Sequence, residues 1–170
     1  MKTWLGKTID GRFALEIEAS VLGTLDRYCL SAGASETGGI LVGRYSDDLS
    51  LASVLEATPP PSDSKRGRAW FVRGVNGLRN LLARRWRAKE RRFYIGEWHY
   101  HPEEHVEPSN EDFAQMLEIG HDRNYDCQEP LLVILGAGIQ DGQRALRAFV
   151  CPVKCPPIEL IRTTGCAPLV

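Results

Sequence analysis

The sequence predicts an α/β (α+β) domain in which a β-sheet is flanked by helices. From Glu18 onward, apolar residues recur at three- and four-residue steps, as on one face of an amphipathic helix. Two short runs, Ile40–Val42 and Leu131–Leu135, are wholly apolar, as expected for covered strands. Helical and extended patterns alternate along the chain, which favours a sheet with helices packed against it.

Length and composition favour one domain over residues 1–170. The chain is 43% hydrophobic and 25% charged, with a net charge of -1, which is typical of a globular protein. No apolar run approaches the roughly 20 residues that cross a bilayer. The N-terminus lacks the apolar core of a signal peptide, so we expect a cytoplasmic protein without membrane contact.

The first part of the chain predicts a leading extended segment or short hairpin over residues 1–17, followed by a helix. Thr8–Gly11 is a turn signal, and the apolar residues Phe13, Leu15 and Ile17 alternate with polar ones. The helix starts at Glu18 and ends near Gly33. The residues expected on its buried face are Val21, Leu22, Leu25, Cys29 and Leu30.

The next segments predict two paired strands and a loop. Gly38 and Gly39 precede the strand Ile40–Val42 and allow a close approach of the backbone. Leu51–Ala57 predicts its partner strand. The prolines, serines and glycine of Thr58–Arg68 predict a surface loop.

A basic segment covers residues 65–92. It predicts a short edge strand at Ala69–Arg73 and an amphipathic helix at Val75–Glu90. The inward residues expected are Val75, Leu78, Leu81, Leu82 and Trp86. We favour a solvated helix face here, and the alternative is a docking surface for an acidic protein. The near-neutral total charge disfavours a nucleic-acid partner.

The last part predicts a helix from Ser109 to about Gly120, then strands at Leu131–Leu135 and Ala145–Val150 around a turn at Gly136–Gly142. The proline-rich tail Cys151–Val170 predicts a non-regular C-terminal strap. An odd number of irregularly spaced cysteines does not predict a disulfide framework. They are Cys29, Cys127, Cys151, Cys155 and Cys166.

A metal site is the strongest functional signal. His99 and His101 follow the apolar run Phe93–Ile95, so they project to the same side of a strand. Ser109 is a good N-cap residue, and Asp112 lies in the first turn of the following helix. Two imidazoles and a carboxylate suit zinc and leave a fourth position for water. A capping box without metal is the simpler alternative.

Glu36 stands just before a predicted central strand. Beside a metal with an open water position, such a carboxylate is a candidate general base. His105 and His121 are the competing histidines, and we expect neither to be a ligand. Cys151 and Cys155 form the closest cysteine pair, but no second pair completes a zinc site.

Together these segments resemble the JAMM motif of the JAB/MPN metallopeptidases. That motif is an upstream glutamate followed by H-x-H-x7-S-x2-D, and every position is filled over residues 12–150. The matching segments are Glu36, Gly38–Gly43, Trp98–Pro102 and Ser109–Asp112. The resemblance implies a cytidine-deaminase-like fold, with a curved mixed sheet flanked by helices.

The resemblance also implies a zinc-dependent isopeptidase or peptidase acting after the C-terminal glycine of a ubiquitin-like protein. It assigns His99, His101 and Asp112 to one catalytic Zn²⁺, Glu36 to acid/base catalysis, and Ser109 to stabilisation of the oxyanion. The compact size resembles bacterial members found in CBASS-like anti-phage operons. Partners implied there are a protein conjugate as substrate and an operon-encoded activating or conjugating enzyme.

Three other classes are weaker. His101-Pro102-Glu103 matches the H-x-E of a nucleobase deaminase, but the required P-C-x-x-C is missing. No cysteine has the sequence context of a thiol protease. The main alternative is a catalytically silent MPN-like scaffold, although such modules usually lack a motif residue.

Overall fold

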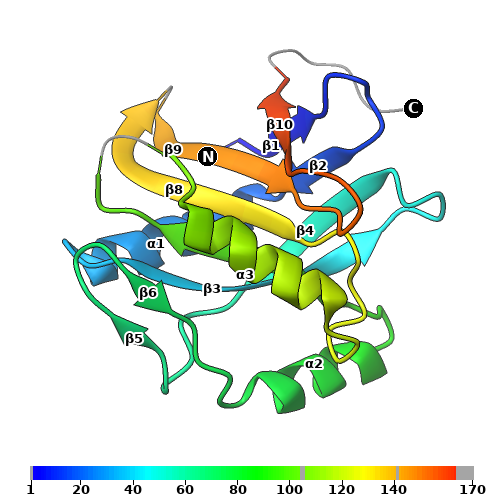
Figure 1. The fold of residues 1–170 in the computed structure, drawn as a ribbon, viewed down its shortest axis with the longest axis horizontal. Coiled ribbons are helices and arrows are strands. Elements are labelled where there is room, and N and C mark those ends of the chain that lie inside the picture. Colours follow the sequence, from blue (N-terminus) through cyan, green and yellow to red (C-terminus); the bar gives the residue numbers. More distant parts are fainter. Residues whose placement is uncertain (1, 104–105, 141, 164–170) are drawn as a thin grey trace.

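The computed structural model describes residues 2–103, 106–140 and 142–163. In this part of the chain, eight strands form a closed barrel, two form a separate hairpin, and three helices pack around the barrel (Figure 1). The barrel order is β1 (Trp4–Lys7), β10 (Ile158–Arg162), β9 (Gln143–Val150), β8 (Leu131–Gln140), β7 (Phe93–Tyr100), β3 (Thr37–Tyr45), β4 (Leu51–Ala57) and β2 (Ala14–Ile17). The other elements are α1 (Ala19–Ala32), β5 (Lys65–Arg66), β6 (Phe71–Val72), α2 (Leu78–Arg87) and α3 (Asn110–His121).

The α/β class is confirmed, but the strands close into a barrel, whereas the prediction was a curved mixed sheet flanked by helices. The mixed character is present, since β7 pairs in parallel with β8 and β2 with β4. Closure depends on β10, which pairs with β1 and with β9. This strand lies in the tail expected to be non-regular, where Pro156 and Pro157 immediately precede it and obscure its pattern.

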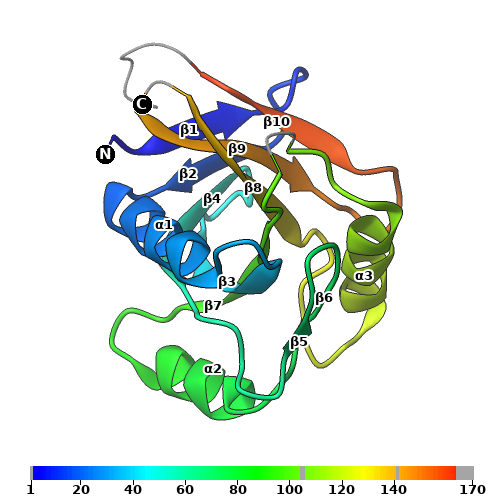
Figure 2. The ribbon, with the colours of Figure 1, turned by 90° about the vertical axis from the view of Figure 1, so that its left-hand side faces the viewer.

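Two apolar clusters cover the strands from opposite sides, and Figure 2 shows α1 and α3 on opposite sides of β3, β7 and β8. The α1-side core contains Leu41 and Trp98 and the buried face of α1. The α3-side core contains Ile40, Ile134 and Met116. Strand β7 therefore lies between two packed layers, and both faces of its central part are buried.

Both predicted helices of the first half form, with corrections. Helix α1 ends at Ala32, and its C-cap Gly33 has a positive φ of 63°, which glycine adopts readily. Leu30 was expected to be inward and is exposed. Helix α2 is shorter than the predicted Val75–Glu90, and of its residues only Leu78 is buried. Val75 and Trp86 are exposed, because this peripheral helix packs against the rest of the protein along only a narrow strip of its surface.

Several boundaries also differ from expectation. The predicted turn Gly136–Gly142 is mostly strand, because β8 continues to Gln140 and pairs there with β9. The predicted loop Thr58–Arg68 contains β5, which pairs with β6 in a hairpin. The expected edge strand at Ala69–Arg73 is thus outside the barrel. None of the described helices has the length and apolar character to cross a membrane.

Candidate metal centre

Strand β7 carries a row of polar side chains toward α3. They are Glu97 and His99, within the strand, and His101, directly after its last residue. Ile95 and Trp98 both face the α1-side core although they are three residues apart. The register against β3 shifts at this point, and Gly96 has a φ of 154° with no room for a Cβ beside Leu131. This bulge changes the alternation and turns the two histidines to the α3 side, on the same face as predicted.

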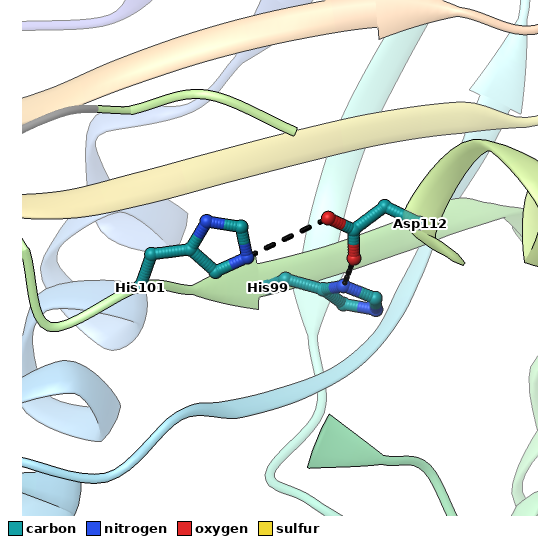
Figure 3. Close-up of side chains that lie close together, drawn as sticks. All are labelled: His99, His101 and Asp112. Atoms are coloured by element: carbon teal, nitrogen blue, oxygen red, sulfur yellow. Dashed lines mark hydrogen bonds and ion pairs between the residues drawn. The ribbon is translucent and has the colours of Figure 1, made fainter. Parts of the chain in front are cut away.

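Asp112 reaches both histidines from the first turn of α3 (Figure 3). Its Oδ1 lies 2.5 Å from Nδ1 of His99, and its Oδ2 lies 3.6 Å from Nε2 of His101. Each of the three residues offers one ligand atom, and these three atoms all lie within 4.8 Å of one another. The sequence-predicted trio therefore converges, from a strand end and a helix start.

Ser109 forms the N-cap of α3 and fixes Asp112. Its Oγ accepts a hydrogen bond from the Asp112 amide at 3.1 Å and donates one to Asp112 Oδ2 at 2.8 Å. The Ser109 amide donates to the same Oδ2 at 2.7 Å. The capping box considered as the simpler alternative is present, and it is also what orients the carboxylate toward the histidines.

The charges of the cluster are coupled. Burial alone would lower the pKa of His99, but its hydrogen bond to Asp112 and the negative charges of Asp112 and Glu97 raise that pKa to about 9. Burial would raise the pKa of Asp112, yet the His99 bond and the Ser109 groups lower it to about 2. Burial lowers the pKa of His101, against the attraction of Asp112. The lowered pKa of Asp112 favours its carboxylate form, and the raised pKa of His99 makes its ring a stronger base.

Glu36 lies at the start of β3, half-buried, and its amide donates to the Gly67 carbonyl at 2.9 Å. Burial raises the pKa of Glu36 to about 6, with a further rise from the negative charges of Asp112 and Glu103. The charge of His99 acts in the opposite direction. Glu36 is therefore close enough to Asp112 and His99 to interact with their charges.

The donor set fits a divalent transition metal. Imidazole nitrogens and a carboxylate oxygen are common zinc ligands, and three of them describe an open, catalytic site. The Nε2 of His99 is buried without a good hydrogen-bond partner, so the ring is not fully satisfied by the protein alone. His121 instead contacts the Leu117 carbonyl through Nδ1 at 2.8 Å, near the end of α3.

The other candidates that the structure describes do not join the cluster. His105 and Cys166 lie outside the described residues. Cys151 is buried and Cys155 is exposed, and both are free thiols. Among the residues that the structure describes, the metal-compatible group of at least three side chains is the trio alone.

Two residues near the site were not singled out in the sequence. Glu97 is 0% exposed and lies 3.5 Å from Nε2 of His99. Arg73 forms an ion pair with Glu97 at 2.7 Å. The sequence does offer a signal for Glu97, because it is a charged residue in an otherwise largely apolar strand, two positions before His99. No sequence pattern distinguishes Arg73 from its basic neighbours, which were expected to be solvated.

Comparisons with known proteins agree with this geometry. The family described as prokaryotic homologs of the JAB domain matches residues 18–151. A protein of Enterobacter hormaechei subsp. hoffmannii, named "CD-NTase/cGAS isopeptidase", is 46% identical over 148 residues, covering 87% of this chain and 81% of its own. A protein of the same name from Pseudomonas aeruginosa is 30% identical over 138 residues, covering 80% and 84%.

A solved structure is similar in fold. The solution structure of protein DSY2949 from Desulfitobacterium hafniense superposes with a TM-score of 0.57 at 17% identity, covering 86% of this chain and 88% of that one. The family match spans five of the eight barrel strands, the three helices, and all five residues of the motif. The resemblance drawn from the sequence is confirmed: this chain belongs to the prokaryotic JAB-domain family.

Proposed function

We propose that this protein is a zinc-dependent isopeptidase that releases a conjugated protein from its target. The observation that carries the proposal is the convergence of His99, His101 and Asp112 within 4.8 Å. The name of the two relatives supports the isopeptidase class and points to a CD-NTase conjugate as the substrate. A ubiquitin-like conjugate, cleaved after its C-terminal glycine, is the related substrate that the motif alone suggests.

In this proposal His99, His101 and Asp112 hold the ion. When bound there, a divalent ion supplies Lewis-acid activation of a water and of the scissile carbonyl. Glu36 removes a proton from the attacking water with its carboxylate and returns it to the leaving lysine amine. A carboxyl with a pKa of about 6 suits both transfers, because it exchanges protons near neutral pH.

Ser109 has a second task in the proposed reaction. Its hydroxyl donates to Asp112 in this structure. By rotating about its χ1 bond, the same hydroxyl would donate to the oxygen that becomes negative on the scissile carbonyl. Losing one such donor commonly costs on the order of 10²–10³ in rate.

The direct test uses a CD-NTase whose C-terminus is joined to a lysine of a second protein. Wild-type protein with bound zinc should cleave the junction, and a chelator should abolish cleavage. Glu36→Gln should keep one zinc per chain and lose turnover, because it cannot accept the proton. His99→Ala/His101→Ala should lose the zinc as well.

Two results would contradict the proposal. Equal zinc in wild type and in the double histidine variant would show that the ligands are elsewhere. Zinc-loaded wild type that binds the conjugate but leaves it intact would favour the catalytically silent scaffold. A panel of ubiquitin-like fusions, run in parallel, would separate the two substrate classes.

A further inference from the structure

We propose that Glu97 is a positioning residue for the metal centre, which fixes the ring of His99 and is itself held by Arg73. The inference rests on the proposed function, because it concerns the same ligand histidine. It adds a residue that the JAMM pattern does not contain. The assignment comes from the buried polar contacts behind His99.

Glu97 lies directly behind the histidine, on the side away from Asp112. Nδ1 of His99 faces Asp112 Oδ1 at 2.5 Å, while Nε2 faces Glu97 Oε2 at 3.5 Å. The second distance is longer than a normal hydrogen bond, and Nε2 is buried without a hydrogen-bond partner. A small shift of the ring toward Glu97 closes that bond and leaves the opposite nitrogen for the ion.

A carboxylate in this place determines which imidazole nitrogen carries the proton. An N–H held by a carboxylate keeps the other nitrogen as a lone-pair donor and makes it a stronger ligand. Glu97 and Asp112 thus contact the two nitrogens of the same ring. The ring is also limited by Phe71, which lies edge-on to it at 5.7 Å between centroids.

Three side chains donate hydrogen bonds to the carboxylate of Glu97. Arg73 Nε donates to its Oε1 at 2.7 Å, and Gln115 Nε2 donates to its Oε2 at 3.1 Å. The Tyr94 hydroxyl donates to Oε1 at 3.4 Å. These donors come from a loop, from α3 and from β7, so the carboxylate has a fixed position between three elements.

Arg73 follows the β5–β6 hairpin and is itself fixed. Its side chain is 4% exposed, and it donates to the Tyr125 hydroxyl at 2.7 Å and to the Gly74 carbonyl at 2.9 Å. Burial would lower the pKa of Arg73, but Glu97 and Tyr125 outweigh it and raise it. Arg73 therefore places a positive charge beside the carboxyl group of Glu97 at a fully buried position.

A purely structural role makes a different prediction, because Glu97 could serve only to neutralise Arg73. The variant that separates these roles is Glu97→Leu/Arg73→Leu. Removing one partner leaves a buried charge and destabilises strongly, whereas replacing both with apolar residues often restores stability. The double variant removes the contact with His99 while it avoids the unpaired charge.

The experiment measures zinc affinity by competition with a chromogenic chelator, and stability by urea unfolding of metal-free protein. Glu97→Gln should weaken zinc binding by about 10- to 100-fold. The double leucine variant should be more stable than Glu97→Leu alone and still bind zinc weakly. Absorption of the cobalt-substituted protein should change in Glu97→Gln, which reports the ligand field directly.

The matched control is Glu56→Leu/Arg85→Leu. That pair joins β4 to α2 at 2.6 Å and is not among the residues that contact the histidines. It should keep wild-type zinc affinity. The inference is overturned if the Glu97/Arg73 double variant, or Glu97→Gln should the double not fold, binds zinc as tightly as wild type. Wild type without zinc at His99 and His101 would overturn the metal centre and this inference together.

Discussion

Gly38 and His99 are directly paired across the antiparallel strands β3 and β7. A Cβ at position 38 would lie 2.9 Å from His99 Cδ2, 2.7 Å from Phe71 Cε1 and 2.5 Å from the Trp98 carbonyl oxygen. The absence of a side chain at position 38 leaves space for the ring of His99, the candidate metal ligand. Gly38 and Gly39 were expected to allow a close approach of the backbone, and Gly38 is approached by the Trp98 carbonyl, the Phe71 ring and the His99 imidazole.

Gly38→Ala should therefore damage the metal site as well as the fold. Overpacking of this kind typically costs about 1–3 kcal/mol of stability. Because the added methyl group displaces the His99 ring, zinc affinity should also fall. Gly43→Ala is the control, since a Cβ there would meet Ser53 and Ile95 away from the histidines. It should reduce the urea midpoint but leave zinc affinity unchanged, and equal affinities in both variants would refute the argument.

Glu36 should leave a pH signature in the stability of the metal-free protein. Its pKa in the folded chain is raised to about 6 from an ordinary value of 4.5, chiefly by burial. The folded state therefore binds this proton more tightly than the unfolded state. Glu36 favours folding below its unfolded pKa, and that contribution is lost as the pH rises through about 6.

Glu36→Gln removes this titration. The metal-free variant should gain in Tm relative to wild type at about pH 8, and the gain should shrink or vanish at about pH 5. Differential scanning calorimetry with chelator present measures both. Asp63 offers a contrast, because it is exposed and accepts hydrogen bonds from the backbone amides of Val75 and Asn76. Asp63→Asn should lower Tm and not raise it, and a Glu36→Gln gain that is independent of pH would contradict the assignment.

Ser109 should affect stability and turnover to different degrees. Ser109→Ala removes the N-cap of α3, which costs typically ~1 kcal/mol. In the proposed reaction it also removes the oxyanion donor, so turnover should fall on the order of 10²–10³. Zinc should remain bound, because the three ligands are intact. Ser109→Thr keeps the cap and the hydroxyl and should recover both, whereas normal turnover in Ser109→Ala would limit Ser109 to capping.

The sequence predicted the site better than the fold around it. His99, His101 and Asp112 could be placed because strand alternation and a helix N-cap are local rules. Glu97 and Arg73 could not be paired from sequence, because they are 24 positions apart and come together only through tertiary packing. The phase of β7 also depends on a bulge at Gly96, which alternation alone does not reveal.

The errors in the predicted fold have similar causes. Trp86 and Leu30 fit helical faces, but the depth to which a helix is covered depends on its neighbours. Closure of the sheet depends on a strand near the C-terminus that pairs with one near the N-terminus. Such a long-range pairing has no local signal, and the prolines before β10 pointed away from a strand.

Strand β10 should therefore be essential for stability, contrary to what a non-regular strap would suggest. Leu160 is 2% exposed in the α1-side core, whereas its neighbour Ile161 is 49% exposed. Leu160→Ala should cost about 2–5 kcal/mol, because it leaves a cavity between β10 and the barrel interior. Ile161→Ala should cost far less, since its side chain already contacts water. Urea unfolding of both variants tests this contrast, and equal midpoints would mean that β10 does not close the barrel in solution.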